Sequence, residues 1–146
     1  MSEEHFGFSL ALVNGDIVLD NGTLRLVSGK RNLLQALELR TLTPFGTDLF
    51  NTAYGLDIQE AFTEPGSLHM VKELIKLNLV RTLGADPRVR DIREIQFQDD
   101  PAYLARHPEV STEVIRDLRH RRFWEVEVVI DTVNNQTETL PVNISI

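Results

Sequence analysis

The chain of 146 residues has no cysteine, few aromatic side chains (7%) and no long apolar run. Without cysteine it forms no disulfide, offers no thiolate nucleophile and builds no Cys-type zinc site. Its apolar stretch over residues 6–13 is interrupted by Gly7 and Ser9, and it is far shorter than the ~20 residues of a membrane span. Because the first residues are acidic, where a secretory signal requires positive charge, we expect a cytoplasmic protein without membrane insertion.

Positive charge is also scarce, since 15 Lys and Arg stand against 22 Asp and Glu and give a net charge of −7. Such a chain repels phosphate on average. This argues against a protein that binds nucleic acid mainly through contacts to the phosphate groups. The content of 42% hydrophobic and 25% charged residues is typical of a globular protein. With no repeat, low-complexity tract or linker, the sequence predicts one α+β domain over residues 1–146.

The first third of the chain predicts a hairpin followed by a helix. Two short apolar runs, residues 17–19 and 24–27, flank the pair Asn-Gly at 21–22, which suits a tight hairpin turn. Leucines at helical spacing then predict a first helix over residues 30–42. Pro44 ends this helix, because the residue before a proline is driven out of the α region.

The second third combines a turn-rich segment with a longer helix. Residues 47–66 hold many turn formers together with large apolar side chains, so we expect this segment to pack on the core; those side chains are Leu49, Phe50, Tyr54, Leu56, Ile58 and Phe62. A second helix is predicted from the capping residue Ser67 to Gly84, with Pro87 shortly after its end. Its broad apolar stripe predicts that one face is buried.

The last third predicts two strands around an insertion. Residues 89–97 favour a strand, and residues 98–122 are interpreted as an insertion with a short third helix over 112–120. Strict alternation over 124–130 predicts a half-buried strand, and the turn at 134–136 leads into a final strand. The expected fold is therefore α+β, with a small mixed or antiparallel sheet, two main helices, a short third helix and a C-terminal β-hairpin.

No group of residues has the spacing of a catalytic or metal site. The four histidines lack the i, i+4 pairing of a helical zinc site. Acidic pairs such as Glu60 with Glu64, or Glu125 with Asp131, fit exposed surface charge better than the two-carboxylate site of a glycosidase. The sequence therefore predicts no catalytic residue, no metal and no cofactor.

Arginines form two clusters, one after the second helix and one before the strand of Trp124: Arg88, Arg90, Arg93 and Arg116, Arg119, Arg121, Arg122. The planar fork of arginine suits protein interfaces, whereas an ordinary hydrated surface is an equally good interpretation. An RNA-binding role for the second cluster is opposed by the negative charge of the chain and by its few aromatic side chains.

The end of the chain is unusual for a strand, because residues 140–146 carry no charged side chain. Exposed strand edges of monomeric proteins are normally protected by charge, proline or cover. Pro141 has no N–H to donate, so we expect it near an edge or at the start of a strand. Two interpretations stay open: another chain completes the hairpin by strand addition, or its own sheet satisfies it.

Four segments, taken in order, resemble the baseplate wedge and sheath-initiator family of contractile phage tails, tailocins, injection systems and type VI secretion: residues 32–37, 42–47, 54–56 and 85–89. The resemblance implies a structural, non-enzymatic protein. It implies baseplate wedge proteins and the sheath protein as partners, with tube or hub proteins as further candidates. It also implies assembly in the cytoplasm and incorporation into a virion tail or injection-particle baseplate.

In this family a Glu-Pro-Arg motif after the long helix contacts neighbouring wedge proteins, and the matching residues are Asp86, Pro87 and Arg88. Aspartate shortens the acidic side chain by one methylene, while arginine can offer a forked donor to a partner. The resemblance further implies that the C-terminal strand interleaves with sheath strands through Leu140, Val142, Ile144 and Ile146.

Two competing hypotheses remain at this point. Some family descriptions carry a lysozyme-like label, which makes a peptidoglycan-cleaving enzyme the natural alternative. A small RNA-binding or protein-binding adaptor is the other, if the motif matches are accidental. Residues 98–122 lie outside the resemblance, and the sequence assigns them no role.

Overall fold

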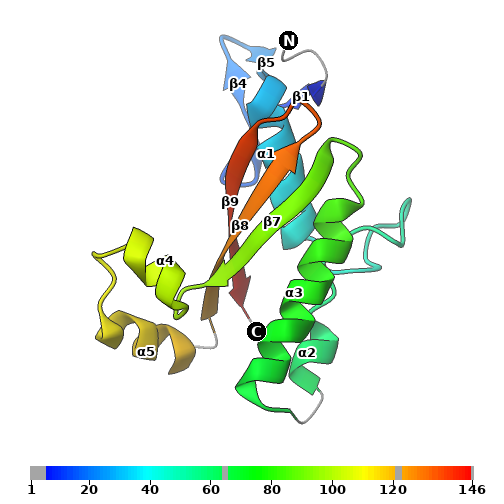
Figure 1. The fold of residues 1–146 in the computed structure, drawn as a ribbon. Helices are drawn as coiled ribbons and strands as arrows, with labels where there is room; N and C mark the ends of the chain where they lie inside the picture. The colour runs from blue at the N-terminus through cyan, green and yellow to red at the C-terminus, as the bar shows by residue number, and fades with distance from the viewer. Residues whose placement is uncertain (1–5, 64–65, 121–122, 146) are drawn as a thin grey trace. The chain divides into compact units, whose positions relative to one another are not determined.

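A computed structural model describes residues 6–63, 66–120 and 123–145. The chain divides into two compact units, Met1–Val89 and Arg90–Ile146. Helices and antiparallel strands occur in both halves of the sequence, so the predicted α+β class is confirmed (Figure 1). The expectation of a single domain stays a prediction, since two compact units of one chain can unfold together or separately.

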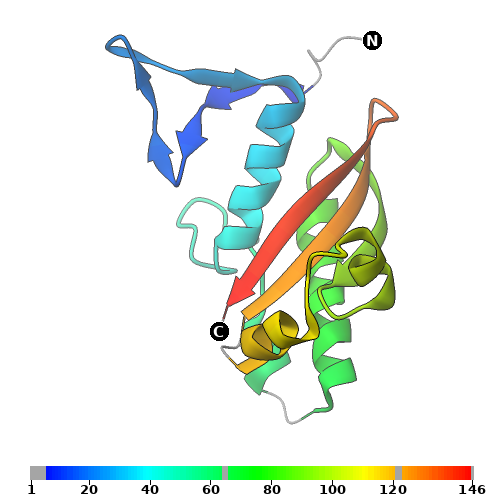
Figure 2. The same cartoon turned by 90° about the vertical axis from the view of Figure 1, so that its left-hand side faces the viewer.

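The first unit begins with six short strands that form three antiparallel pairs (Figure 2, blue). The pairs are β1 (Phe8–Leu10) with β6 (Leu26–Ser28), β2 (Leu12–Val13) with β3 (Asp16–Ile17), and β4 (Leu19–Asp20) with β5 (Thr23–Leu24). They meet at a ring of backbone hydrogen bonds, in which the N–H of Ala11 donates to Arg25, that of Arg25 to Val18 and that of Val18 to Ala11. We call this element the three-arm junction.

The three-arm junction confirms the predicted turn and corrects its strands. Asn21 and Gly22 have positive φ angles of 50° and 79°, as a tight turn requires. The predicted strand 17–19 is split, because Ile17 pairs with Leu12 whereas Leu19 pairs with Leu24. The reason is a second Asn-Gly pair at 14–15, also with positive φ, which makes a hairpin of its own.

Three helices complete the first unit: α1 (Gly29–Leu42), α2 (Gln59–Thr63) and α3 (Leu68–Gly84). Both long helices occur where the leucine spacing predicts them, and the hydroxyl of Ser67 caps α3 by accepting the N–H of Met70 (3.3 Å). Helix α1 packs against α3. Their facing leucines and one isoleucine are fully buried: Leu33, Leu37, Ile75, Leu79 and Leu83.

The loop between α1 and α2 differs from the expectation. Leu56 is buried, as predicted, but Leu49 and Phe50 are 91% and 100% exposed. The segment around them is held by its own hydrogen bonds, with the N–H groups of Phe45 and Gly46 donating to the carbonyls of Leu56 and Tyr54. The prediction that all large apolar groups of residues 47–66 pack on the core is therefore wrong at this tip.

The second unit is a three-stranded sheet with two short helices: β7 (Val89–Phe97), α4 (Pro101–Arg106), α5 (Thr112–His120), β8 (Phe123–Thr132) and β9 (Thr137–Ser145). The strand order is β7-β8-β9, so β8 is central. The segment 98–122 contains the predicted helix α5 and a further helix, α4, which starts at Pro101. Proline suits the first turn of a helix, because the N–H that it lacks has no partner there.

Strand β8 shows the predicted alternation, with one row of side chains buried: Trp124, Val126, Val128 and Ile130. Its antiparallel register with β9 places Trp124 opposite Ile144 and Val128 opposite Leu140. The predicted C-terminal hairpin is confirmed, and Asn135 takes a positive φ of 60° in its turn. Among the described residues, no helix has both the length and the apolar content to cross a bilayer.

Candidate functional site

The residues Asp86, Pro87 and Arg88 form a tight corner after α3. The N–H of Asp86 donates to the carbonyl of Leu83 (3.2 Å), and the N–H of Val89 donates to the carbonyl of Asp86 (3.0 Å). Pro87 is exposed and cannot continue the helix, because it has no N–H and its ring clashes with the preceding turn. The sequence pattern therefore fixes where α3 ends and where the next strand begins.

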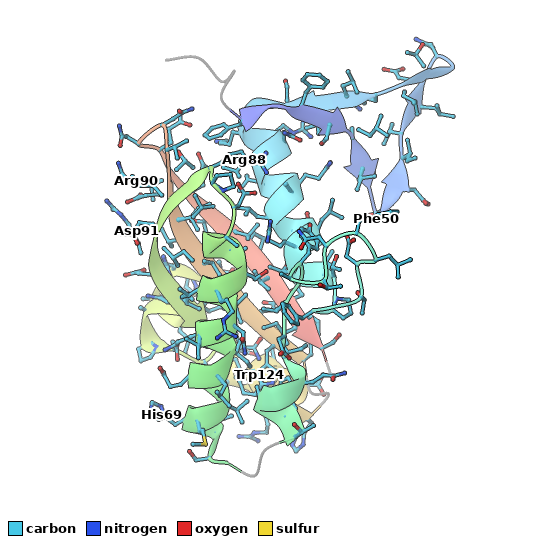
Figure 3. The ribbon with its side chains drawn as sticks, turned by 90° about the vertical axis from the view of Figure 1, so that its right-hand side faces the viewer. Phe50, His69, Arg88, Arg90, Asp91 and Trp124 are labelled. Carbon is cyan, nitrogen blue, oxygen red and sulfur yellow. The ribbon has the colours of Figure 1, made fainter. Side chains whose placement is uncertain are left out.

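The side chain of Arg88, labelled in Figure 3, is hydrogen-bonded within its own unit. Its Nε and Nη2 atoms donate to the two carboxylate oxygens of Asp86, at 2.9 and 2.7 Å. Its Nη1 atom donates to the carbonyl of Phe6 at 3.0 Å. The fork thus joins the corner to the chain just before the three-arm junction, 82 residues earlier in the sequence.

The Phe6 carbonyl has a second donor, which sequence reasoning missed. The side-chain amide of Asn32 in α1 donates to it at 2.7 Å, and the Oδ1 atom of Asn32 accepts the hydroxyl of Ser9. Asn32 is 4% exposed and Phe6 is 1% exposed. An asparagine among the apolar residues of an amphipathic helix is the signal that could have marked it, since a buried amide needs partners.

The electrostatics of the corner favour the ion pair. Burial alone raises the pKa of the Asp86 carboxyl, but the hydrogen bonds and charge of Arg88, together with Arg40, outweigh it and hold that pKa below its usual range. The carboxylate of Asp86 likewise raises the pKa of the Arg88 guanidinium. Both groups are charged near neutral pH and stabilise one another.

This geometry changes what Arg88 can contribute to a partner. We expected the fork to be presented to a neighbouring protein, whereas Nε, Nη1 and Nη2 each donate inside the molecule. The corner therefore has a fixed shape with Pro87 on its surface. Whether a partner binds there stays a prediction, and any contribution of Arg88 would come mainly through the shape that it holds.

Strand β9 is the outer strand of the sheet, and the register shows which of its backbone groups point outward. The N–H of Thr132 donates to the carbonyl of Gln136 (2.8 Å), so this pair is hydrogen-bonded. Bonded and non-bonded pairs alternate along an antiparallel ladder. Every second residue of β9 therefore directs its N–H and C=O away from β8: Thr137, Thr139, Pro141, Asn143 and Ser145. We call this row the β9 edge.

Pro141 fits this assignment. It lies opposite Glu127 at a position whose backbone groups point away from β8, so the N–H that proline lacks is not needed there. Its expected place at an edge is confirmed, since no described strand pairs with β9 on its outer side. The missing donor interrupts the β9 edge between Thr139 and Asn143. Proline is one of the devices that protect exposed edges from unwanted pairing.

The apolar side chains of β9 are not displayed on the surface. Leu140, Val142 and Ile144 are 3%, 2% and 2% exposed, so they belong to the core of the structure. The expectation that a partner contacts these residues can hold only for their strand and its backbone edge, rather than for open side-chain pockets. Ile146 lies outside the described residues.

Two of the four carboxylates considered for an enzyme, Glu125 and Asp131, take part in structural contacts. Asp131 accepts hydrogen bonds from Arg93 (2.6 Å) and from the hydroxyl of Thr137 (2.7 Å), and Glu125 accepts one from Tyr103 (3.1 Å). In the part of the chain that the structure describes, no group of three or more His, Asp or Glu could hold a metal ion. The side chains of Glu60 and Arg119, and residues Glu64, Arg121 and Arg122, lie outside that part.

Comparison with known proteins adds no identification. No protein-family model matches the sequence, and no curated protein matches it as a relative.

Proposed function

We propose that this protein is a non-enzymatic assembly component of a contractile-tail or injection-system baseplate, in which the β9 edge receives a strand of the sheath protein. The resemblance of the four ordered segments supports the class of machine. The observation that carries the proposal is the β9 edge, a row of outward backbone groups on a strand whose apolar side chains are already buried.

Strand addition at the β9 edge needs little rearrangement. An incoming strand would find N–H donors at Thr139 and Asn143 and carbonyl acceptors along the row, and each backbone hydrogen bond is worth about 0.5–1.5 kcal/mol net. Pro141 divides the edge into two short halves. A strand must therefore match the position of this gap, which gives register and selectivity that a continuous edge lacks.

The corner at Asp86–Arg88 is the proposed second contact, with the wedge proteins of the baseplate. Its support is the match to the family motif and its fixed geometry, because the Arg88 fork holds the corner rigid and a rigid surface loses less entropy when it binds. Docking through this corner would place the sheet on a finished baseplate. The sheath would then begin to assemble only at that place.

The test removes one outward donor from the β9 edge. Asn143→Pro deletes an N–H that β8 does not use, and Pro141 shows that the strand accepts proline in this outward phase. Asn143→Thr is the matched control, because it changes the same side chain and keeps the N–H.

We expect both variants to fold and to enter baseplates. Particles with assembled sheath should decrease about two- to tenfold for Asn143→Pro, the effect of losing one backbone hydrogen bond worth about 0.5–1.5 kcal/mol, and should be unchanged for Asn143→Thr. Electron microscopy of particles from cells that carry each variant measures the ratio of sheathed to bare tubes. Equal ratios for the two variants would overturn the proposed role of the edge.

A further inference from the structure

The most exposed large apolar side chains of the described chain are adjacent in sequence. Leu49 and Phe50 are 91% and 100% exposed, at the tip of the loop between α1 and α2 (Figure 3). Single exposed apolar residues are common on soluble proteins. An adjacent leucine and phenylalanine that are both almost fully exposed on one short loop are less common. The structure of the loop shows how they are held there.

The base of this loop is locked onto the two long helices. Its two ends pair in a bridge between Pro44 and Leu56, and the hydroxyl of Thr82 in α3 donates to the carbonyl of Gly55 (2.7 Å). Gly55 has a φ of 109°, and a Cβ atom there would lie 2.5 Å from the carbonyl oxygen of Thr43. Only glycine fits this close approach, so the base has one conformation.

The tip of the loop is ordered by a second set of bonds. The Asp48 carboxylate accepts the N–H groups of Phe50 (2.8 Å) and Asn51 (3.0 Å), and the amide oxygen of Asn51 accepts the N–H of Ala53 (3.2 Å). Such side-chain turns fix the backbone locally. Leu49 and Phe50 are therefore presented on a pre-organised backbone, which lowers the entropy that binding would cost.

The charge of the loop indicates what kind of surface it meets. Residues 44–56 contain Asp48 and no lysine or arginine, and Asp57 follows directly. Arg40 lies at the base of the loop, 4.6 Å from the centre of the Tyr54 ring. Membrane-binding segments combine apolar residues with cations that are attracted to anionic lipids. An acidic loop on a chain of net charge −7 is repelled by such lipids, so a protein pocket is the better match.

We propose that the loop over residues 44–56 is a docking anchor, which inserts Leu49 and Phe50 into an apolar pocket of a partner protein with a neutral or basic rim. Buried aromatic anchors commonly provide most of the affinity of an interface. This inference is independent of the proposed role in a contractile tail, because it depends only on the exposure, order and charge of the loop.

The test starts in the cells that produce the protein. Phe50 is replaced by the photo-reactive analogue p-benzoylphenylalanine in the full chain, and the cross-linked peptides are identified by mass spectrometry. The same probe at Leu77, which is 55% exposed on α3, is the matched control. We expect a discrete adduct from position 50 with one other protein and no such adduct from position 77.

Binding to the purified cross-linked protein then tests the anchor and its order. Leu49→Ser should raise Kd by at least about 30-fold, while Leu77→Ser should leave it unchanged. Asp48→Ala keeps both apolar side chains and removes only the carboxylate that orders the tip, so Kd should rise about fivefold, the ratio typical of a lost local cap. Asp48→Asn retains an acceptor oxygen and should restore binding.

Four results would overturn the anchor. Adducts with lipid would assign the tip to a membrane surface, and adducts with a second copy of this chain would assign it to self-association. Equal labelling from positions 50 and 77, or equal Kd values for Leu49→Ser and Leu77→Ser, would show that the tip has no special role. A discrete partner from outside any tail particle would leave the anchor standing and would instead contradict the proposed function.

Discussion

Truncation of Arg88 is the sharpest test of the corner, and its cost can be worked from the structure. Arg88→Ala removes two hydrogen bonds to the Asp86 carboxylate and one to the Phe6 carbonyl. The Asp86 side chain, 6% exposed, then keeps the hydrogen bond from the N–H of residue 88 and the charge of Arg40. Loss of one partner from a buried ion pair lowers the free energy of unfolding by about 3–5 kcal/mol. Because the Arg88 side chain is 24% exposed, water can reach the Asp86 carboxylate, and we expect the lower value of about 3 kcal/mol.

A loss of about 3 kcal/mol corresponds to a decrease of roughly 10 °C in Tm for a chain of this size. Circular dichroism at 222 nm follows mainly α1 and α3 in the first unit, whereas fluorescence of Trp124, the single tryptophan, follows the second. Coincident transitions would mean that the two units unfold together. If the first unit alone shifts, the chain behaves as two domains, and the expectation of one domain over residues 1–146 fails.

Arg90→Ala is the matched control for this experiment. Its side chain is 51% exposed, and its partner Asp131 retains Arg93 at 2.6 Å, so the expected cost is below about 1 kcal/mol. If Arg88→Ala costs no more than Arg90→Ala, the corner is not held by the ion pair and the reasoning is refuted. A cost near 3 kcal/mol would also mean that Arg88→Ala tests docking and folding together, so docking must be tested at Pro87 instead.

The pH dependence of the same variant gives a second measurement. Because the pKa of Asp86 is lowered in the folded protein, its contribution is present above the unfolded value of about 4 and is lost as the pH falls through the folded value. The stability difference between wild type and Arg88→Ala should therefore narrow in acid. A difference that stays constant from pH 7 to about pH 2 would contradict the charged pair.

Three further predictions concern other residues. The pKa of His107 is raised chiefly by its hydrogen bond to Glu127, so the anchoring of α4 should weaken as the pH rises through that pKa. The protection factors of amides 101–106, which remove the intrinsic pH dependence of hydrogen exchange, should fall there in wild type and stay constant in His107→Gln. Burial and Glu125 raise the pKa of Tyr103 to about 12, and ultraviolet titration of Tyr103→Phe should lack that step. Gly55→Ala should destabilise the fold by about 2 kcal/mol or more in urea, because a positive φ and a 2.5 Å contact both oppose a side chain.

The sequence predicts those helices and strands that are determined by residues close to one another in the chain. The stripe of leucines predicts α1 and α3 within a residue or two, Ser67 marks the start of α3, and alternation predicts β8. In each case the side chains that determine the element lie within a few positions of one another. The place of Pro141 on an edge follows in the same way, from the donor that proline lacks.

Long-range partners could not be predicted in this way. Nothing near Arg88 indicates that its fork reaches the carbonyl of Phe6, and nothing near Asn32 indicates that its amide reaches the same atom. The exposure of Phe50 has a similar origin. Its hydrophobicity favours burial, but the turn formed by Asp48 and the bridge at the loop base fix the backbone so that the ring lies in solvent.

The two proposed surfaces depend on backbone order in different ways, and this separates their tests. At the β9 edge the recognition groups are the backbone N–H and C=O themselves, so the informative change is a proline that deletes one donor and leaves the buried side chains in place. At the loop the recognition groups are Leu49 and Phe50, and the backbone only presents them, so the informative change is Asp48→Ala, which disorders the tip and keeps both side chains. If Asn143→Pro impaired sheath formation but the cross-linker at position 50 still gave its discrete adduct in that variant, the chain would be using the two surfaces independently.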